Sequence, residues 1–181
     1  MVKKTNLSAE IAKIITNLTK IDTDWEKSLY LPVRSMTAKK KGVFGEKVYK
    51  VSLDQIGISY SPATSSDADL NVNGQNVEVK MGTRTNRDKK GNYSFTFFQI
   101  RQFQNYDQLV FVCVYPDRID VRQIAKKDFM TFAAAHPKQI IWAGGKKKKI
   151  TCNGDINQND LFHFIIPNDQ WGNDFVLLIS L

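Results

Sequence analysis

Cysteines, histidines and long apolar segments are all scarce in this chain of 181 residues. Its two cysteines, Cys113 and Cys152, show no CxxC or Cys/His spacing, which argues against a disulfide framework and a structural zinc site. The longest apolar run spans only residues 109–115, whereas a membrane helix needs about 20. No apolar segment follows the basic N-terminal residues, and the glycine patterns that bind nucleotides are absent. We therefore expect an intracellular, cytoplasmic protein with no membrane partner.

Acidic residues are outnumbered. The chain carries 26 Lys and Arg against 18 Asp and Glu, which gives a formal net charge of +8 and a pI near 9.4. Such an excess favours a polyanionic partner, most often nucleic acid. Residues 1–90 hold 16 basic and 10 acidic side chains, and residues 91–181 hold 10 and 8, so the excess lies mainly in the first half. The length fits a single domain over residues 1–181.

The apolar pattern predicts a mixed α/β chain with a hairpin near its middle. Residues 67–72 and 76–81 alternate as strands. Asn73 and Gly74 between them both accept the positive φ of a type I′ turn. Helices are predicted at 8–20, 24–31, 42–56, 99–106 and 126–135, and further strands at 93–98, 109–115, 118–124, 139–142, 161–166 and 175–179.

The predicted hairpin gathers two acids and a lysine at one edge of the sheet. Asp67 and Asp69 share one face of the first strand, and the turn places Asp69 roughly opposite Glu78. Lys80 shares a face with Glu78. Two such carboxylates repel each other unless a divalent cation lies between them, and the lysine can orient or deprotonate a water beside it. This chemistry suits metal-assisted phosphodiester hydrolysis; an ordinary cross-strand salt bridge is the alternative.

These residues resemble a known motif. Asp69, followed after eight residues by Glu78, Val79 and Lys80, is similar to the PD-(D/E)xK motif of a nuclease superfamily. The resemblance implies that Asp69 and Glu78 bind Mg²⁺, for which Mn²⁺ can substitute, together with the backbone carbonyl of Val79. It also implies that Lys80 positions the attacking water and helps to stabilise the charge that develops on the phosphorus.

The resemblance covers about residues 42–124 and implies a fold class. That fold is α/β, with a restriction-endonuclease-like core in which helices flank a central mixed β-sheet. Residues 125–181 would complete the fold and contribute DNA contacts. Ala68 stands where the motif name has proline, and Asp67 remains an alternative to Asp69 as the metal-binding acid.

Weaker features extend the resemblance. Glu46, in the helix predicted at 42–56, resembles a helix glutamate that joins the metal site in some members of the superfamily. Gln99 and Gln102 are further candidates, because several members carry a glutamine at this distance after the lysine. Gln102 and Tyr106 also have the Gln-x-x-x-Tyr spacing of the RecB-like branch.

A small protein of this kind looks most like a type II restriction endonuclease. Such an enzyme cuts double-stranded DNA as a homodimer on a palindrome and needs a cognate DNA methyltransferase in its host. A structure-specific repair or Holliday-junction nuclease is the alternative of the same fold, and a non-catalytic DNA-binding module is the alternative of another class. Basic residues in three predicted loops are expected to contact phosphates or base edges. These are Lys39, Lys40, Lys41, Arg84, Arg87, Lys89, Lys90, Lys146 and Lys147.

Overall fold

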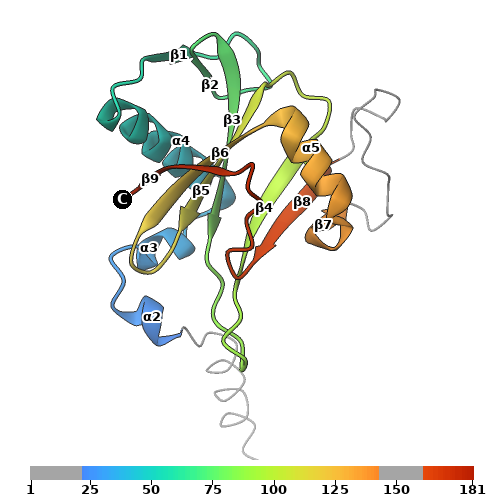
Figure 1. Cartoon of the computed structure of the whole chain (residues 1–181). Coiled ribbons are helices and arrows are strands. Elements are labelled where there is room, and N and C mark those ends of the chain that lie inside the picture. Colours follow the sequence, from blue (N-terminus) through green and yellow to red (C-terminus); the bar gives the residue numbers. More distant parts are fainter. Residues whose placement is uncertain (1–21, 143–160) are drawn as a thin grey trace, which may run out of the picture.

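The computed structural model describes residues 22–142 and 161–181 (Figure 1). The helix predicted at 8–20 and two of the expected DNA contacts, Lys146 and Lys147, lie outside these ranges. The described part is built from a larger and a smaller β-sheet with helices packed on them. No helix within it has the length and apolar character needed to cross a membrane.

The larger sheet has six strands in the order β1-β2-β3-β5-β6-β9. Strands β3 and β5 run parallel and the other neighbouring pairs run antiparallel, so the expected central mixed sheet is confirmed. Strand β5 is buried along nearly its whole length, in keeping with its unbroken apolar sequence. The strands are β1 (Tyr60–Pro62), β2 (Leu70–Val72), β3 (Gln75–Thr83), β5 (Gln108–Val114), β6 (Ile119–Ala125) and β9 (Val176–Ser180).

The predicted hairpin is β2–β3. Asn73 and Gly74 form its turn with φ of 52° and 81°, and the two strands pair in the expected register. The first strand is shorter than predicted, because β2 begins at Leu70. Asp67 and Asp69 therefore lie in the segment that leads into the strand.

Helix α4 (Ala38–Gln55) packs on one face of the larger sheet, with α2 (Thr23–Glu26) and α3 (Leu31–Arg34) below it in Figure 1. Lys39, Lys40 and Lys41 were expected in a loop before the helix predicted at 42–56, but the helix begins earlier and includes them. The side chain of Thr37 accepts a hydrogen bond from the amide of Lys40, so Thr37 caps the helix and the lysines that follow belong to its first turn. The core on this face includes Trp25, Tyr49, Leu53, Val77, Val79, Val110 and Val112.

The helix predicted at 24–31 is in fact split into α2 and α3. The predicted helix ends directly before Pro32, whereas in the structure Pro32 lies in the first turn of α3. Proline is tolerated there because the amides of a first turn have no partner within the helix.

The smaller sheet consists of β4 (Ser94–Arg101), β8 (Leu161–Pro167) and β7 (Ile140–Trp142), in the order β4-β8-β7. Helix α5 (Lys126–Ala135) lies where the sequence predicted a helix, and the 3₁₀ turn η1 (Pro137–Gln139) follows it. These elements enclose an aromatic core against the larger sheet. It includes Phe95, Phe97, Phe111, Phe129, Phe162, Phe164 and Phe175.

The helix predicted at 99–106 is wrong. Strand β4 continues to Arg101, and turns and bends follow it. Pairing with β8 prevails over the local helical pattern because it places Phe97 and Ile100 in the aromatic core.

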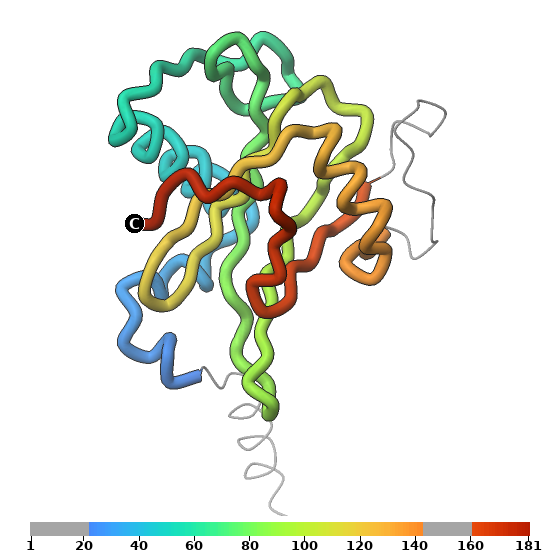
Figure 2. The backbone as a smooth tube through the Cα atoms, in the orientation of Figure 1, coloured from blue at the N-terminus to red at the C-terminus, as the bar shows by residue number. Residues whose placement is uncertain are grey.

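Strands β3 and β4 are connected through a long extension that runs away from the rest of the molecule (Figure 2). Within it, the amide of Thr85 donates to the carbonyl of Ser94 at 2.9 Å. Closer to the sheets, a Cβ atom on Gly82 would lie 3.0 Å from a ring carbon of Phe97. The absence of a side chain at Gly82 therefore allows β3 and β4 to approach each other.

Candidate active site

Asp69 is held against β3 beside Glu78. The pairing of β2 with β3 brings the Asp69 amide to the carbonyl of Val77 at 2.9 Å, and the side-chain Oδ2 of Asp69 accepts the amide of Val79 at 2.7 Å. The amide and carbonyl of one strand residue point to the same side. The carbonyl of Val79 therefore faces the same edge of β3 as the Asp69 carboxylate.

Glu78 and Lys80 lie on one face of β3 and form an ion pair of 2.5 Å between Oε1 and Nζ. Their side chains are only 11% and 16% exposed. Burial raises the pKa of Glu78 to about 7; the Lys80 charge lowers it, while Asp69 raises it through its charge and a side-chain hydrogen bond. The two carboxyl groups are thus close enough to oppose each other's ionisation.

Glu46 approaches the same group from α4. Burial raises its pKa, the charge of Asp69 raises it further, and Lys50 on the same helix lowers it. The helix packs tightly here, because a Cβ atom on Gly45 would lie 2.8 Å from Cβ of Met81 on β3. The glycine before Glu46 therefore permits the contact between α4 and β3 that places this glutamate near Asp69.

Asp67, the alternative acid, makes other contacts. Its Oδ2 accepts the amide of Asn105 at 3.0 Å, and its own amide donates to the side chain of Ser65 at 3.1 Å. It thus ties its own turn to the loop after β4. Asp69, in contrast, interacts with both Glu46 and Glu78.

The donor set at this edge suits a hard divalent cation. Among residues 22–142 and 161–181, no group of three or more His, Cys, Asp and Glu side chains is placed to hold a metal ion. The Asp69 carboxylate shares an edge of β3 with the Val79 carbonyl, and it interacts directly with the Glu78 carboxyl group. Mg²⁺ keeps several of its waters and commonly binds one or two carboxylates plus substrate phosphates, so these residues fit it.

A cleft of about 720 Å³ opens beside Lys80, between the start of α4, β3 and the smaller sheet. Lys41 contributes a second cation to its wall, and its pKa is lowered by burial and by the nearby Arg34. Gln99, a candidate from the sequence, also lines the cleft. Phe98 and His163 line it too, although neither was singled out by sequence analysis.

One signal in the sequence could have revealed Phe98. Phe97 and Phe98 are adjacent, and side chains of a strand alternate between its faces. Both rings therefore cannot enter the core, and one of them must face outward. His163 carried no comparable signal, because only the pairing of β8 with β4 brings it to the cleft.

Gln102 and Tyr106 are buried. Within the described part of the chain, the amide nitrogen and oxygen of Gln102 have no hydrogen-bond partner. The hydroxyl of Tyr106 donates to the carbonyl of Arg101 at 3.0 Å, and burial raises its pKa, with a smaller contribution from the Glu78 charge. Tyr106 thus lies within electrostatic reach of the candidate site, while nothing places Gln102 in the cleft.

The expected DNA contacts occupy different environments. Lys39 and Lys40 are exposed in the first turn of α4, where the helix dipole disfavours cations, and Lys89 and Lys90 are exposed in the extension. Arg87 is half-exposed, and its Nε donates to Asp24 at 2.9 Å. Because the helix dipole does not stabilise cations at a helix start, Lys39 and Lys40 remain available to bind an external anion.

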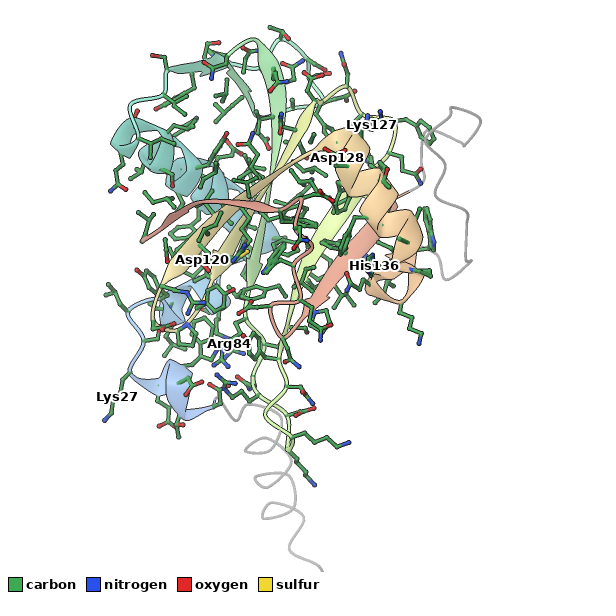
Figure 3. All side chains as sticks on the ribbon, viewed as in Figure 1. Lys27, Arg84, Asp120, Lys127, Asp128 and His136 are labelled. Atoms are coloured by element: carbon green, nitrogen blue, oxygen red, sulfur yellow. The ribbon has the colours of Figure 1, made fainter. Side chains whose placement is uncertain are left out.

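Arg84 requires a correction. It was expected to contact DNA, but its side chain is only 2% exposed and lies between α2 and the strands (Figure 3). Its Nη2 donates to both carboxylate oxygens of Asp22 at 3.1 Å and to Asp24 at 3.0 Å. The guanidinium also lies 5.3 Å from the ring centre of Tyr93. Arg84 therefore joins α2 to the extension and does not present a charge to the surface.

Comparisons with known proteins add little. No family model matches the chain, and no curated protein matches it. A solved bacterial homing endonuclease, I-Ssp6803I, is similar in part, with a TM-score of 0.38 and 17% sequence identity. The match covers 52% of this chain and 70% of that chain. The fold itself is a mixed α/β arrangement in which helices flank a central mixed sheet.

Proposed function

We propose that this protein is a Mg²⁺-dependent endonuclease that hydrolyses phosphodiester bonds of double-stranded DNA. The observation that carries the proposal is the grouping of Asp69, Glu78 and Lys80 around β3, next to a cleft that Lys41 and Lys80 line. Lys80 offsets the charge of only one acid of this pair, so ionisation of both buried acids calls for a further cation. A divalent cation would offset the negative charge of the acids, and a substrate phosphate would pair with the lysines that line the cleft.

Each residue has a distinct role in this proposal. Asp69, Glu78 and the Val79 carbonyl hold the metal ion, which would supply electrophilic activation of the phosphate and acidify its bound water. Lys80, anchored by Glu78 at 2.5 Å, orients the attacking water through its Nζ and offsets negative charge on the phosphate. Glu46 shapes the acidic group from the helix side.

The wider surface fits a polyanion. Lys41 lies in the cleft with Lys80, and Lys39 and Lys40 stand exposed at the adjoining helix start. These cations bind phosphates without regard to sequence. We further propose a type II restriction-like specificity, with two copies of the chain acting on a palindrome and a cognate methyltransferase protecting the host DNA.

The test is cleavage of plasmid and phage DNA by the purified protein in Mg²⁺ or Mn²⁺. We expect discrete fragments, which disappear with EDTA and in Lys80→Ala and Glu78→Gln. Each variant has a matched control. Asp54→Asn alters an exposed acid of α4 and Lys138→Ala an exposed lysine of η1, so both should cut like the wild type.

Other outcomes discriminate among the alternatives. A smear of fragments would contradict restriction-like specificity while leaving the nuclease intact. Cleavage of branched but not linear DNA would indicate a structure-specific nuclease. Retardation of DNA with no cleavage in either metal would overturn the proposed enzyme in favour of a non-catalytic binding module.

A further inference from the structure

A β-bulge interrupts β4 where it borders the cleft. Phe97 pairs with Phe164 and Ile100 pairs with Phe162, so two residues of β4, Phe98 and Gln99, stand opposite the single intervening residue of β8. The extra residue changes which side chains face the core. Phe97 and Ile100 are both buried, whereas the two residues between them are exposed.

The bulge is held in a backbone conformation that its sequence does not favour. Gln99 has a φ of 59°, whereas the other non-glycine residues with positive φ in the described ranges are Asn or Asp. Those side chains tolerate the left-handed region better than glutamine does. His163 supports the bulge, because its Nδ1 accepts the amide of Gln99 at 3.2 Å. Strain of this kind is often retained at functional sites.

Phe98 is exposed to solvent, although large apolar side chains are usually buried. The residue is 59% exposed, and its ring rests against the ring of His163, with the ring centres 4.9 Å apart at an angle of 61°. On the far side of His163, the paired residue Ile141 is 49% exposed. On the outer face of the smaller sheet, the Phe98 ring therefore contacts His163 on one side and is exposed to solvent on the other.

This ring borders the same cleft as two cations. Phe98, Lys41 and Lys80 all line it, and Lys80 belongs to the candidate active site. A buried apolar partner would be poorly matched to a wall that holds two lysines. A nucleic acid can bind both kinds of side chain in this wall. Its phosphates pair with the lysines, and every base has a flat face that stacks on an aromatic ring.

We propose that Phe98 is a base-contacting residue, whose ring stacks on a nucleobase of the DNA held in the cleft. The proposal rests on the proposed function only for the identity of the ligand. Strand alternation directs the Phe98 ring away from the core, and the contact with His163 limits its motion. Lys41 and Lys80, on the same cleft wall, would bind the phosphate backbone of the DNA. Contact with a duplex requires local unstacking at one base step, as with other apolar side chains inserted into DNA.

Stacking and phosphate binding differ in their dependence on salt, and this difference provides the test. Affinity for one fixed DNA duplex is measured from low to high salt in Ca²⁺, for the wild type, Phe98→Ala and Lys41→Ala. We expect Phe98→Ala to weaken binding by about 5- to 100-fold at every salt concentration without changing the slope. Lys41→Ala should reduce the slope of the logarithmic plot by about one.

Further variants separate stacking from loss of fold. Phe98→Tyr keeps a flat ring and should bind like the wild type, whereas Phe98→Leu keeps apolar bulk and should bind like Phe98→Ala. Val51→Ala truncates an exposed apolar residue of α4, away from the cleft, and should have no effect. Duplexes with 2-aminopurine at successive positions should show a fluorescence change that is lost in Phe98→Ala.

The results distinguish this inference from the proposed function. If the wild type cuts DNA but Phe98→Ala binds as tightly as Val51→Ala, the base contact is refuted and the nuclease stands. If the wild type binds without cutting and Phe98→Ala is weakened as expected, the nuclease is refuted and the base contact stands. If the wild type binds no DNA, both are refuted. A partner protein at Phe98 would leave DNA affinity unchanged in every variant of this residue.

Discussion

The backbone amide of Val79 donates a 2.7 Å hydrogen bond to Oδ2 of Asp69. This bond holds an acid that precedes β2 against the strand that carries Glu78 and Lys80. Asp67 makes a different contact, because its Oδ2 accepts the amide of Asn105.

Substitution of the two aspartates should separate their roles. Asn at position 69 keeps an oxygen to accept the Val79 amide but loses the negative charge. We expect Asp69→Asn to reduce Mn²⁺ affinity by about tenfold or more, since even residues that only support a ligand contribute about 10- to 100-fold. Asp67→Asn should leave the affinity unchanged. Isothermal titration calorimetry measures both, and the reverse order would make Asp67 the ligand.

The stability of the metal-free protein should depend on pH through Glu78. Its pKa is about 7 in the folded chain against an ordinary value of 4.5, mainly because of burial. A group whose pKa is raised by folding stabilises the folded state below its unfolded pKa, and this contribution is lost as the pH rises through the folded pKa. The window of loss for Glu78 therefore runs from about pH 4.5 to pH 7.

Comparison of the wild type with Glu78→Gln isolates this effect. Urea unfolding in EDTA should show Glu78→Gln gaining stability relative to the wild type as the pH rises from about 4 to 8, by up to about 3 kcal/mol. Addition of Mg²⁺ at pH 8 should stabilise the wild type more than the variant. A difference between the two proteins that stays constant with pH would contradict the raised pKa.

Arg84 should be a structural residue. Arg84→Met removes the charge that pairs with Asp22 and Asp24, and the loss of one partner of a buried ion pair costs about 3–5 kcal/mol. Because Asp24 is 42% exposed, we expect a smaller loss of about 2–3 kcal/mol in urea unfolding. The matched variant Lys89→Ala, in the exposed part of the extension, should keep its stability and weaken DNA binding. If Arg84→Met instead kept normal stability and bound DNA more weakly, Arg84 would be a DNA contact.

Two glycines of α4 should respond in opposite directions to alanine. A Cβ atom on Gly45 would lie 2.8 Å from Cβ of Met81, so Gly45→Ala should destabilise the fold by about 1–3 kcal/mol. Beyond its own helix turn and chain neighbours, no heavy atom of the described residues lies within 4 Å of such a Cβ on Gly42, so Gly42→Ala should stabilise the fold by up to about 1 kcal/mol. Thermal unfolding measures both. Equal effects would show that α4 and β3 are not in close contact.

The parts of the fold that sequence analysis predicted correctly depend on short-range chemistry. Asn73 and Gly74 accept positive φ whatever surrounds them, and the spacing of Glu78 and Lys80 places them on one face of any strand. The apolar run that became β5 could hardly occupy any place other than the centre of a sheet. These local rules were sufficient for the hairpin and for the shared face of Glu78 and Lys80.

Long-range packing accounts for the features that the local pattern concealed. The charge of Arg84 is buried because α2 and its N-cap supply two aspartates from 60 and 62 positions earlier in the chain. Gln99 entered a strand instead of a helix because β8 pairs with β4 and draws Ile100 into the aromatic core. The same pairing brought His163 beside the outward-facing ring of Phe98. Residue types and their spacing thus specify which groups can perform chemistry, while contacts between distant segments determine which groups are buried, paired or exposed, because burial and ion pairing depend on neighbours that are remote in sequence.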